Sequence, residues 1–583
     1  MIKKLAACIR DAKLTAILTP ILVVCESVLE VIIPLTMADL IDKGITVGNM
    51  DEVVRYGAIL LALTAAALFF GAAAGYTASR ASSLFARNVR QDMYYNVQHF
   101  SFANIDRFSP ASLVTRLTTD VTNVQMAFQM ITRITFRAPA MLIFAFVFSF
   151  RINAELASIF IAVIPFLAII LFIIVRAAFP RFERVFKTYD RLNNVVEEDL
   201  RGIRVVKSFV REDHEIDKFG KISGSIYRDF TKAEKTVAFN APAMQIAVYA
   251  CVILISWLGA NSIVAGGNIP GNGLTTGELM SMFTYAMQIL MSLMMLSMIF
   301  VMLTISKASA ERIAEVLGEK SDIVDGRENI TDVKDGSIEF RNVSFKYSDK
   351  AENEALRHIN LKIGSGQTEG VIGGTGSSKS TLVQMIPRLY DATVGEVMVG
   401  GVDVRDYNLD ALRNNVAMVL QKNVLFSGTI RENLRWGDEN ATDADIERVC
   451  RLACADEFIQ TFPDKYDTYI EQGGSNVSGG QKQRLCIARA LLKKPKILIL
   501  DDSTSAVDTK TDAMIRKAFA EEIPDTTKII IAQRISSVSD ADLIVVMDNG
   551  AISDAGTHDE LYARSEIYRE VYDSQTKGGS DDE

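Results

Sequence analysis

The sequence predicts a multidomain protein in which an all-α polytopic membrane domain is followed by an α/β domain. The chain has 583 residues, which is too long for one ordinary hydrophobic core. Residues 1–320 contain 31 Lys and Arg against 26 Asp and Glu, whereas residues 321–583 contain 31 against 45. A mostly apolar first part joined to an acidic second part disfavours both a purely soluble enzyme and a DNA-binding protein.

Six apolar stretches in the first part are long enough to span a bilayer, which takes about 20 residues each. They cover roughly residues 14–41, 56–76, 131–150, 156–175, 238–264 and 279–305. From Gly336 the pattern changes to short β-rich runs separated by turn residues. This change of pattern predicts the start of the α/β domain.

Basic residues predict the orientation of the spans. Residues 176–235 contain fourteen Lys and Arg, residues 44–54 and 261–278 contain none, and four basic residues precede the first span: Lys3, Lys4, Arg10 and Lys13. We therefore expect both termini, both long loops and the α/β domain to face the cytosol, with the spans in the plasma (inner) membrane.

The two long loops do not read as irregular segments. Residues 81–100 and 181–219 are charged, nearly free of Gly and Pro, and periodic at helical spacing. We therefore expect the membrane helices to continue into the cytosol and turn back there. Such extensions need a partner surface, and the acidic domain is the candidate.

Polar residues inside spans are costly and often functional. Glu26 and Glu30 lie one turn apart in the first span, as do Arg133 and Arg137 in the third. Mutual pairing and a path for a polar substrate are both open interpretations. In the sixth span a stripe of flexible thioethers is compatible with varied apolar ligands or with ordinary packing: Met280, Met287, Met291, Met294, Met298 and Met302.

The cysteines predict neither a disulfide framework nor a metal site. The six residues have no paired spacing, which fits reduced thiols. Cys450 and Cys454 are one helical turn apart, but no further Cys or His lies near them in the sequence.

Residues 373–381 read Gly-Gly-Thr-Gly-Ser-Ser-Lys-Ser-Thr, between an apolar run and a predicted helix. This pattern predicts a phosphate-binding loop, in which backbone N–H groups and a helix N-terminus surround phosphate oxygens. Lys379 reaches the outer phosphates and Ser380 is suited to hold Mg2+. The remaining loop residues that we expect at the nucleotide are Thr375, Gly376, Ser377, Ser378 and Thr381.

Two further motifs belong with this loop. Residues 496–502 read as a buried parallel strand that ends in Asp501 and Asp502. Asp501 is placed to bind Mg2+, and the residue after it normally orients or deprotonates the attacking water. Ser478, Gly479, Gly480 and Gln481 precede a predicted helix, so they form a second phosphate-binding helix end.

With these motifs the chain resembles a half-transporter of the ABC exporter family, in which six membrane helices are fused to one P-loop ATPase domain with a helical subdomain. The resemblance implies ATP and Mg2+ as cofactors. It implies that Tyr347 stacks on adenine and that Gln421 contacts Mg2+ and the membrane domain. It also implies that the Ser478–Gln481 signature binds ATP held by the opposite subunit, and that Ser112–Asp120 and Glu197–Lys207 belong to coupling loops.

Three positions depart from the family pattern. Asp502 stands where the family has a catalytic Glu, and Gln533 stands where it has a His that contacts the γ-phosphate. Ser378 occupies a loop position that is usually Gly. The signature is intact except for Val477 in place of Leu. Together the departures predict a site that binds ATP but hydrolyses it poorly; engineering of the site is the less economical explanation.

The departures fall in one site of a dimer, because each ATP lies between the phosphate loop of one chain and the signature of the other. We therefore expect a heterodimer in which the partner, a second and non-identical ABC half-transporter, supplies a proper Glu and His. A homodimer with two slow sites is one alternative, and an ATP-gated channel or regulatory subunit is another. Hydrophobic or amphipathic substrates are expected, but drugs, lipids and peptides remain open.

The expected domain organisation follows from these patterns. It comprises a transmembrane domain (1–320) with coupling loops at about 101–120 and 197–211, a linker (321–335), a nucleotide-binding domain (336–572) and a disordered tail (573–583).

Overall fold

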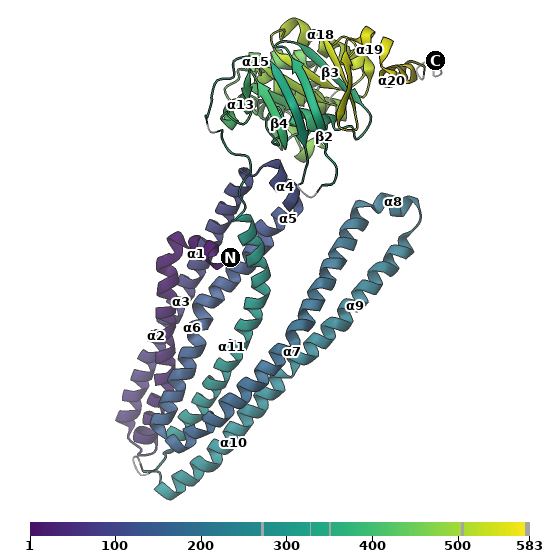
Figure 1. Cartoon of the computed structure of the whole chain (residues 1–583). Coiled ribbons are helices and arrows are strands. Elements are labelled where there is room, and N and C mark those ends of the chain that lie inside the picture. The colour runs from purple at the N-terminus through teal and green to yellow at the C-terminus, as the bar shows by residue number, and fades with distance from the viewer. Residues whose placement is uncertain (270–272, 327, 349–350, 503–506, 578–583) are drawn as a thin grey trace. The chain divides into compact units, whose positions relative to one another are not determined.

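The computed structural model describes residues 1–269, 273–326, 328–348, 351–502 and 507–577. The chain divides into two compact units, which are drawn together in Figure 1. A helical unit contains residues 1–99 and 108–319, and an α/β unit contains residues 100–107 and 320–583. The short segment 100–107, part of the first expected coupling loop, therefore clusters with the α/β unit.

Among its described residues, the helical unit contains six helices that are long and apolar enough to cross a membrane, which confirms the six predicted spans. Its α-helices are α1 (Ile2–Ala7), α2 (Lys13–Asp39), α3 (Met50–Gln98), α5 (Pro110–Thr115), α6 (Val121–Ile152), α7 (Ala154–Arg201), α8 (Ile203–Ser208), α9 (Glu212–Ala238), α10 (Asn240–Gly266) and α11 (Thr276–Val316). A 3-10 turn precedes α2 (Arg10–Ala12), and π-helical turns follow α2 (Leu40–Ile45) and precede α6 (Arg116–Asp120).

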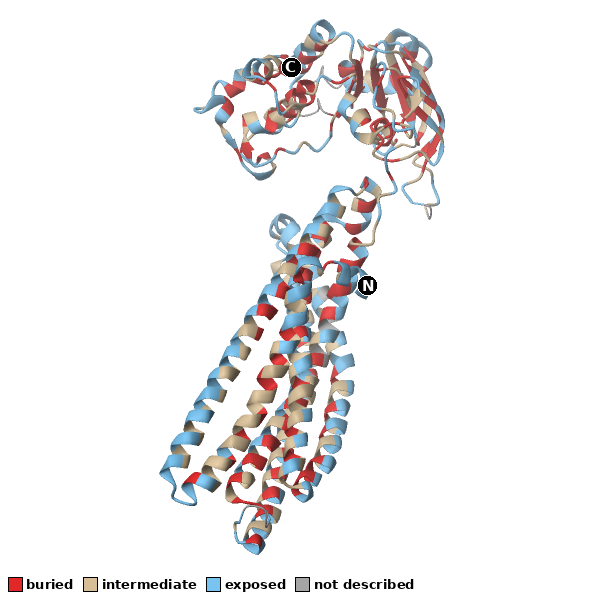
Figure 2. Ribbon diagram, turned by 90° about the vertical axis from the view of Figure 1, so that its left-hand side faces the viewer, coloured by how far each residue is buried: buried red, intermediate tan, exposed pale blue. Residues whose placement is uncertain are grey.

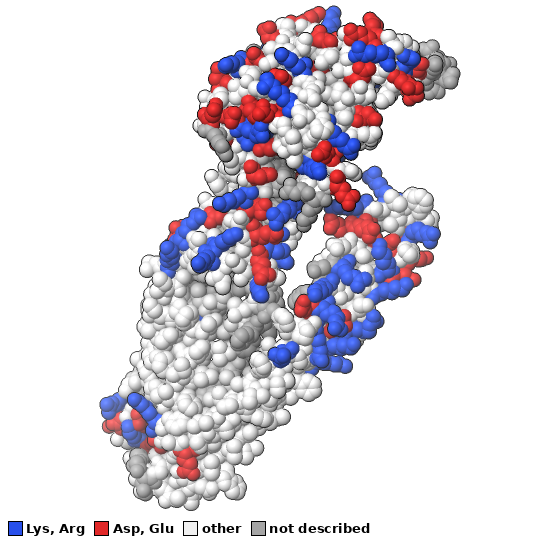
Figure 3. All heavy atoms as spheres, in the orientation of Figure 1, with Lys and Arg blue, Asp and Glu red and all other residues white. Residues whose placement is uncertain are grey.

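The helices extend well beyond the thickness of a bilayer, as the charge pattern of the loops predicts. Helix α3 has 49 residues and α7 has 48, and a helix of this length spans about 70 Å, against about 30 Å for the hydrocarbon core. Helices α7 and α9 run side by side and are joined by α8 (Figure 1). On the face drawn in Figure 3, a broad uncharged region separates the charged ends of the helical unit.

Of the charged residues Glu26, Glu30, Arg133 and Arg137 in the first and third spans, three pair with one another. Arg137 on α6 donates from Nη1 to Glu26 Oε1 at 2.5 Å and from Nη2 to Glu30 Oε1 at 2.6 Å, both on α2. Gly71 on α3 leaves room for this pairing, because a Cβ there would lie 2.8 Å from Glu26 Oε1. The fourth residue, Arg133, extends toward Gly75 of α3. The pairing interpretation therefore accounts for Glu26, Glu30 and Arg137.

The methionine stripe lies mostly on the surface of the chain. Of the six residues, Met280, Met287, Met291, Met294 and Met298 are exposed on α11, and Met302 is half-buried. This exposure leaves both interpretations of the stripe open, because a partner chain, lipid or a substrate would each cover it.

The α/β unit combines three sheets with short helices. Its strands are β1 (Ile338–Phe345), β2 (Leu356–Ile363), β3 (Thr368–Gly373), β4 (Val394–Val399), β5 (Val402–Asp403), β6 (Val416–Val419), β7 (Gly428–Thr429), β8 (Tyr469–Ile470), β9 (Ile497–Asp501), β10 (Thr527–Ile531), β11 (Leu543–Asp548) and β12 (Ala551–Gly556). Its helices are α4 (Phe102–Phe108), α12 (Lys379–Gln384), α13 (Leu409–Asn415), α14 (Ile430–Arg435), α15 (Asp443–Leu452), α16 (Asp456–Ile459), α17 (Gly479–Leu492), α18 (Thr509–Glu522), α19 (His558–Arg564) and α20 (Glu566–Lys577). Together with the helical unit, these elements confirm the predicted fold class.

The main sheet has six strands in the order β12-β11-β3-β10-β9-β6. All pairings in it are parallel except that of β11 with the edge strand β12. Every residue of β9 and of β10 is buried, as expected for parallel strands covered on both faces. Figure 2 shows buried strands in the α/β unit in red. Because β3, β10, β9 and β6 are consecutive neighbours, the loops that follow them emerge at one edge of the sheet.

The C-terminal segment corrects one expectation. Residues 573–577, expected to be disordered, continue α20, while residues 578–583 lie outside the described part of the chain. Tyr568 of this helix is fully buried, and Val571 and Tyr572 pack against the core. This apolar face holds the helix in place, and the sequence analysis underestimated it because the end of the chain is rich in polar residues.

Candidate functional site

The predicted phosphate-binding loop connects β3 to α12. Lys379, the first residue of α12, donates from Nζ to Gly373 O at 2.8 Å and to Gly374 O at 2.9 Å, so its ammonium group lies over the loop. Gly376 has a φ of 84°, which glycine adopts without strain. Burial lowers the pKa of Lys379, and the nearby Asp502 and Asp501 oppose this effect.

Ser378 also has a left-handed backbone, with a φ of 68°, at the position before α12 where the related pattern has Gly. A non-glycine residue in this backbone region is strained by roughly 1–2 kcal/mol. Replacing it by Gly removes this strain, but part of the gain is lost because Gly has more conformational entropy in the unfolded chain. We expect Ser378→Gly to stabilise the nucleotide-free chain by about 1 kcal/mol, which raises the Tm of a domain of this size by roughly 2–4 °C. Thermal unfolding of the full-length chain measures this change.

Ser377→Gly is the matched control, because Ser377 is adjacent, buried and outside the left-handed region. This control should lower the Tm. A Ser378→Gly variant that is no more stable than the parent would show that the loop carries no strain at this position.

Ser380 and Asp501 bring two hard oxygen donors together. Ser380 Oγ donates to Asp501 Oδ1 at 2.9 Å, and Asp501 is the last residue of the buried strand β9. Burial raises the pKa of Asp501, the adjacent Asp502 adds to this rise, and Ser380 and Lys379 oppose it. Hydroxyl and carboxylate oxygens suit Mg2+, so this pair fits the expected ion.

The Asp502 side chain contacts side chains from two other loops. Its Oδ2 accepts from Gln533 Nε2 at 2.6 Å and from Gln421 Nε2 at 3.2 Å. Gln421 follows β6, Asp502 follows β9 and Gln533 follows β10, so the sheet order brings the three side chains together. Two neutral amides therefore hold the carboxylate that occupies the position of the catalytic base in the related pattern.

Tyr347 lies next to the phosphate loop. Its hydroxyl is 2.8 Å from Thr381 Oγ1, and its ring is half exposed. Tyr390 packs edge-on against Tyr347 with ring centroids 5.3 Å apart, and it donates to Asp106 Oδ2 at 2.7 Å. Asp106 belongs to α4, in the first expected coupling loop, so one aromatic contact joins that loop to the expected adenine platform.

The signature residues cap a separate helix. Ser478 Oγ accepts from Gln481 N at 3.3 Å, and Gln481 Oε1 accepts from Ser478 N at 2.9 Å, which forms a capping box at the start of α17. Gly479 and Gly480 form the first turn of this helix. Within the described residues, the contacts of Ser478 and Gln481 are within their own segment, and none joins them to the phosphate loop.

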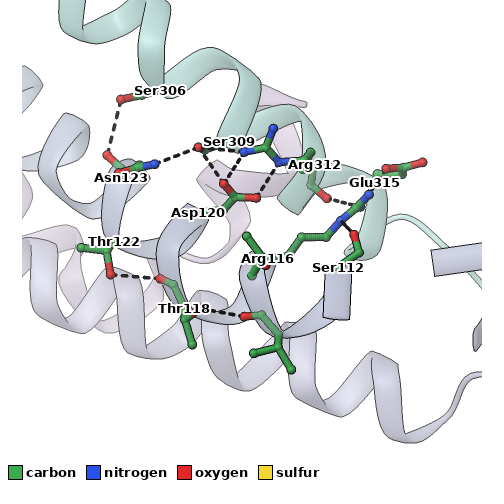
Figure 4. Close-up of polar contacts among 12 residues, drawn as sticks. Ser112, Arg116, Thr118, Asp120, Thr122, Asn123, Ser306, Ser309, Arg312 and Glu315 are labelled. Carbon is green, nitrogen blue, oxygen red and sulfur yellow. Dashed lines mark hydrogen bonds and ion pairs between the residues drawn. The ribbon is translucent and has the colours of Figure 1, made fainter. Parts of the chain in front are cut away.

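The rest of the first expected coupling loop contacts α11, the last helix of the helical unit (Figure 4). Asp120 is fully buried and accepts from Arg312 Nε at 2.7 Å and from Ser309 Oγ at 2.9 Å. Arg116 Nη1 donates to Arg312 O at 2.8 Å and to Glu315 Oε2 at 2.7 Å. These contacts tie the π-helical turn at Arg116–Asp120 to the end of α11.

Two residues of the α/β unit carry features that the sequence motifs did not indicate. Gln575 on α20 hydrogen-bonds the loop that contains Gln533, and no sequence pattern marks this contact. Glu369 is buried in β3, the strand that leads into the phosphate loop, and neither of its carboxylate oxygens has a hydrogen-bond partner among the described residues. The sequence did contain a sign of this buried carboxyl group, since Glu369 is the one charged residue in the strand 368–373. No group of three or more His, Cys, Asp or Glu side chains that could hold a metal ion occurs among the described residues, and Cys450 and Cys454 belong to no such group.

Comparisons with known proteins find matches to both halves of the chain. Residues 16–293 match the ABC transporter transmembrane region, and residues 356–505 match the ABC transporter family. The chain is 36% identical to the ABC transporter ATP-binding protein YfiB of Bacillus subtilis over 98% of both chains. It is 34% identical to the ABC transporter ATP-binding protein Rv1273c of Mycobacterium tuberculosis over 93% of both chains. It is 31% identical to an ATP-dependent lipid A-core flippase of Desulfotalea psychrophila over 92% of both chains.

Proposed function

Since the chain belongs to the ABC transporter family, as a half-transporter with an N-terminal transmembrane region and a C-terminal ATPase domain, we propose that it is one subunit of a heterodimeric exporter. Its own ATP site is degenerate, and its signature completes the competent site of the partner. The observation that carries the proposal is the environment of Asp502. Its side chain is one methylene shorter than that of Glu, and its carboxylate accepts hydrogen bonds from Gln533 and Gln421.

At the degenerate site the chain binds ATP with the residues of its phosphate loop. Backbone N–H groups of Thr375–Ser378 and the start of α12 surround the phosphates, Lys379 contacts the outer phosphates, and Tyr347 stacks on adenine. Ser380, Asp501 and Gln421 hold Mg2+, which neutralises charge on the phosphates when it is bound. Asp502 lacks the reach to position water, and Gln533 contacts the γ-phosphate without carrying charge.

At the competent site the partner provides the phosphate loop, a Glu base and a His. This chain provides Ser478, Gly479, Gly480 and Gln481. The Ser478 hydroxyl and the backbone N–H groups of Gly479 and Gly480 stabilise the charge on the transferred phosphoryl group, while Gln481 holds the start of α17. The capping box supports this role because it fixes the first turn of α17 and leaves the N–H groups of Gly479 and Gly480 without an intrahelical acceptor. ATP at the degenerate site keeps the two nucleotide-binding domains engaged for longer.

Both coupling loops transmit closure of the nucleotide-binding domains to the spans. The first loop supports this step through two contacts, Asp106 with Tyr390 in the α/β unit and Asp120 with Arg312 in the helical unit. The second loop ends in α8, which exposes Ile203, Val205 and nearby Phe209. We propose that the spans lie in the plasma membrane, with the nucleotide-binding domain and both termini in the cytosol.

The proposed substrates are hydrophobic or amphipathic molecules moved out of the cytosol. The exposed methionine stripe of α11 supports this class, because thioethers repack around varied apolar surfaces. The flippase among the relatives acts on lipid A-core by its name, so a lipid is one form that the substrate takes within this proposal.

Two differently tagged copies of the chain, expressed together in its native membranes, test the heterodimer. Purification through one tag should recover a second, non-identical half-transporter in equal amount and little of the other tagged copy. Recovery of the other tagged copy in equal amount would establish the slow homodimer instead. ATP-dependent uphill transport into inverted vesicles, absent with a non-hydrolysable nucleotide, distinguishes a pump from an ATP-gated channel.

A further inference from the structure

The C-terminal helix α20 contacts the loop that carries Gln533. Gln575 Nε2 donates to Gln533 O at 2.7 Å, and Gln575 Oε1 accepts from Ile535 N at 2.9 Å. One amide side chain therefore uses both its donor and its acceptor on two backbone groups of the same loop. A side-chain amide carries a donor and an acceptor side by side, so it can serve a carbonyl and an N–H at once.

The helix that presents Gln575 is fixed to the body of the α/β unit. Tyr568 is fully buried and its hydroxyl lies 2.6 Å from His558 Nδ1 of α19, while Val571 and Tyr572 pack against the core. The loop itself leaves the sheet at Ile531, the last residue of β10, before a 3-10 turn at Ile535–Ser537. Gln575 thus connects the fixed helix α20 to the segment between β10 and the 3-10 turn.

The loop position matters because Gln533 points at the catalytic edge of the sheet. The backbone of Gln533 is held by Gln575, while its side chain donates to Asp502 at 2.6 Å. A shift of the Gln533 carbonyl would move its side-chain amide relative to the phosphate loop. A displacement of about 1 Å in this loop is enough to weaken the contact between the Gln533 side chain and a terminal phosphate.

We infer that Gln575 is a positioning residue that sets the reach of Gln533 toward the terminal phosphate of ATP, and so the preference of this site for ATP over ADP. The inference rests on the proposed function only in taking Gln533 as the γ-phosphate contact. It assigns to the C-terminal helix a part in nucleotide discrimination, beyond its packing role.

Gln575→Glu is the informative variant, because a carboxylate still accepts from Ile535 N–H but repels the carbonyl oxygen of Gln533. Affinities for ATP and for ADP are measured on the purified full-length chain in lipid nanodiscs, by displacement of a fluorescent nucleotide with Mg2+ present. Loss of hydrogen bonds of this kind changes an equilibrium by about two- to tenfold. We expect ATP affinity to fall within that range while ADP affinity stays within about twofold of the parent.

Ser574→Ala is the matched control on the same helix, because Ser574 Oγ donates to Val571 O within α20. It should leave both affinities unchanged. Gln533→Ala provides the test for action through Gln533: in that background, adding Gln575→Glu should not change the ratio of ATP to ADP affinity any further.

Equal weakening of ATP and ADP by Gln575→Glu would overturn the inference, because it would indicate a general loss of structure. An unchanged ratio, or a full further loss in the Gln533→Ala background, would also overturn it. These readouts use one chain and no turnover. Failure of the heterodimer proposal, seen as rapid hydrolysis by the chain alone, is therefore a separate result.

Discussion

Replacing Asp502 by Glu and Gln533 by His is expected to raise ATP turnover at the chain's own site by up to about 100-fold, the factor that a displacement of about 1 Å can cost. The added methylene moves the carboxylate toward the attacking water, and His restores a group that can carry positive charge beside the γ-phosphate. The change also removes the amide that now donates to Asp502 at 2.6 Å. Phosphate release by the complex with the partner half-transporter, after removal of the partner's own catalytic base, measures the effect at this chain's site.

Asp502→Asn is the matched control for this prediction. It keeps the side-chain length but removes the charge, so it should give no increase. Lys379→Ala in the repaired chain should abolish the gained activity, which would show that the turnover comes from this site. Absence of any gain, even with Ser378→Gly added, would mean that the base and the γ-phosphate contact do not limit the site.

Glu369 is expected to make the α/β unit less stable as the pH rises toward 8. It is 1% exposed in β3, between Ile529 of β10 and Leu543 of β11, and burial raises its pKa to about 8. In the unfolded chain a Glu titrates near about 4.3. Between these values the folded state keeps the proton and the unfolded state releases it, so unfolding is favoured by increasing pH.

The stabilisation from the protonated Glu369 is complete below the unfolded pKa and is lost as pH rises to about 8. The loss is about 1.4 kcal/mol per pH unit, or on the order of 3 kcal/mol from pH 6 to pH 8. For a domain of this size the Tm should fall by roughly 6–12 °C over that interval. Thermal unfolding of the full-length chain at several pH values measures this slope.

Glu369→Gln should remove this pH dependence and leave the variant more stable than the parent at pH 8. Glu522→Gln, on the exposed end of α18, is the matched control and should keep the slope of the parent. A parent chain whose Tm does not depend on pH between 6 and 8, or a slope that persists in Glu369→Gln, would contradict the assignment of a neutral buried carboxyl group.

The sequence predicted most of the candidate site because its geometry follows from strand order. Gln421, Asp501 and Gln533 each follow a short apolar run, and such runs become parallel neighbours in one sheet. The six spans were also predictable, because each is a long apolar stretch. Their extensions were predictable because the charged segments that follow keep helical periodicity. The roles of the individual site residues remain proposals.

Long-range pairings were not predictable from local patterns. Arg137 was one of two arginines a turn apart, and only helix packing shows that it pairs with Glu26 and Glu30 while Arg133 does not. Gln575 lies in a polar C-terminal stretch expected to be disordered, although the apolar side chains before it anchor α20. Both cases depend on which faces of distant elements meet, which one sequence does not specify.

Steady-state ATP hydrolysis by the purified chain alone, reconstituted in lipid without any second half-transporter, tests the central claim most directly. A degenerate site and a missing partner predict turnover below about 1 s⁻¹ per site, the lower limit typical of phosphoryl-transferring kinases. Turnover between about 1 and 100 s⁻¹ per site would contradict the account, because it would mean that Asp502 and Gln533 support catalysis and that the chain needs no partner.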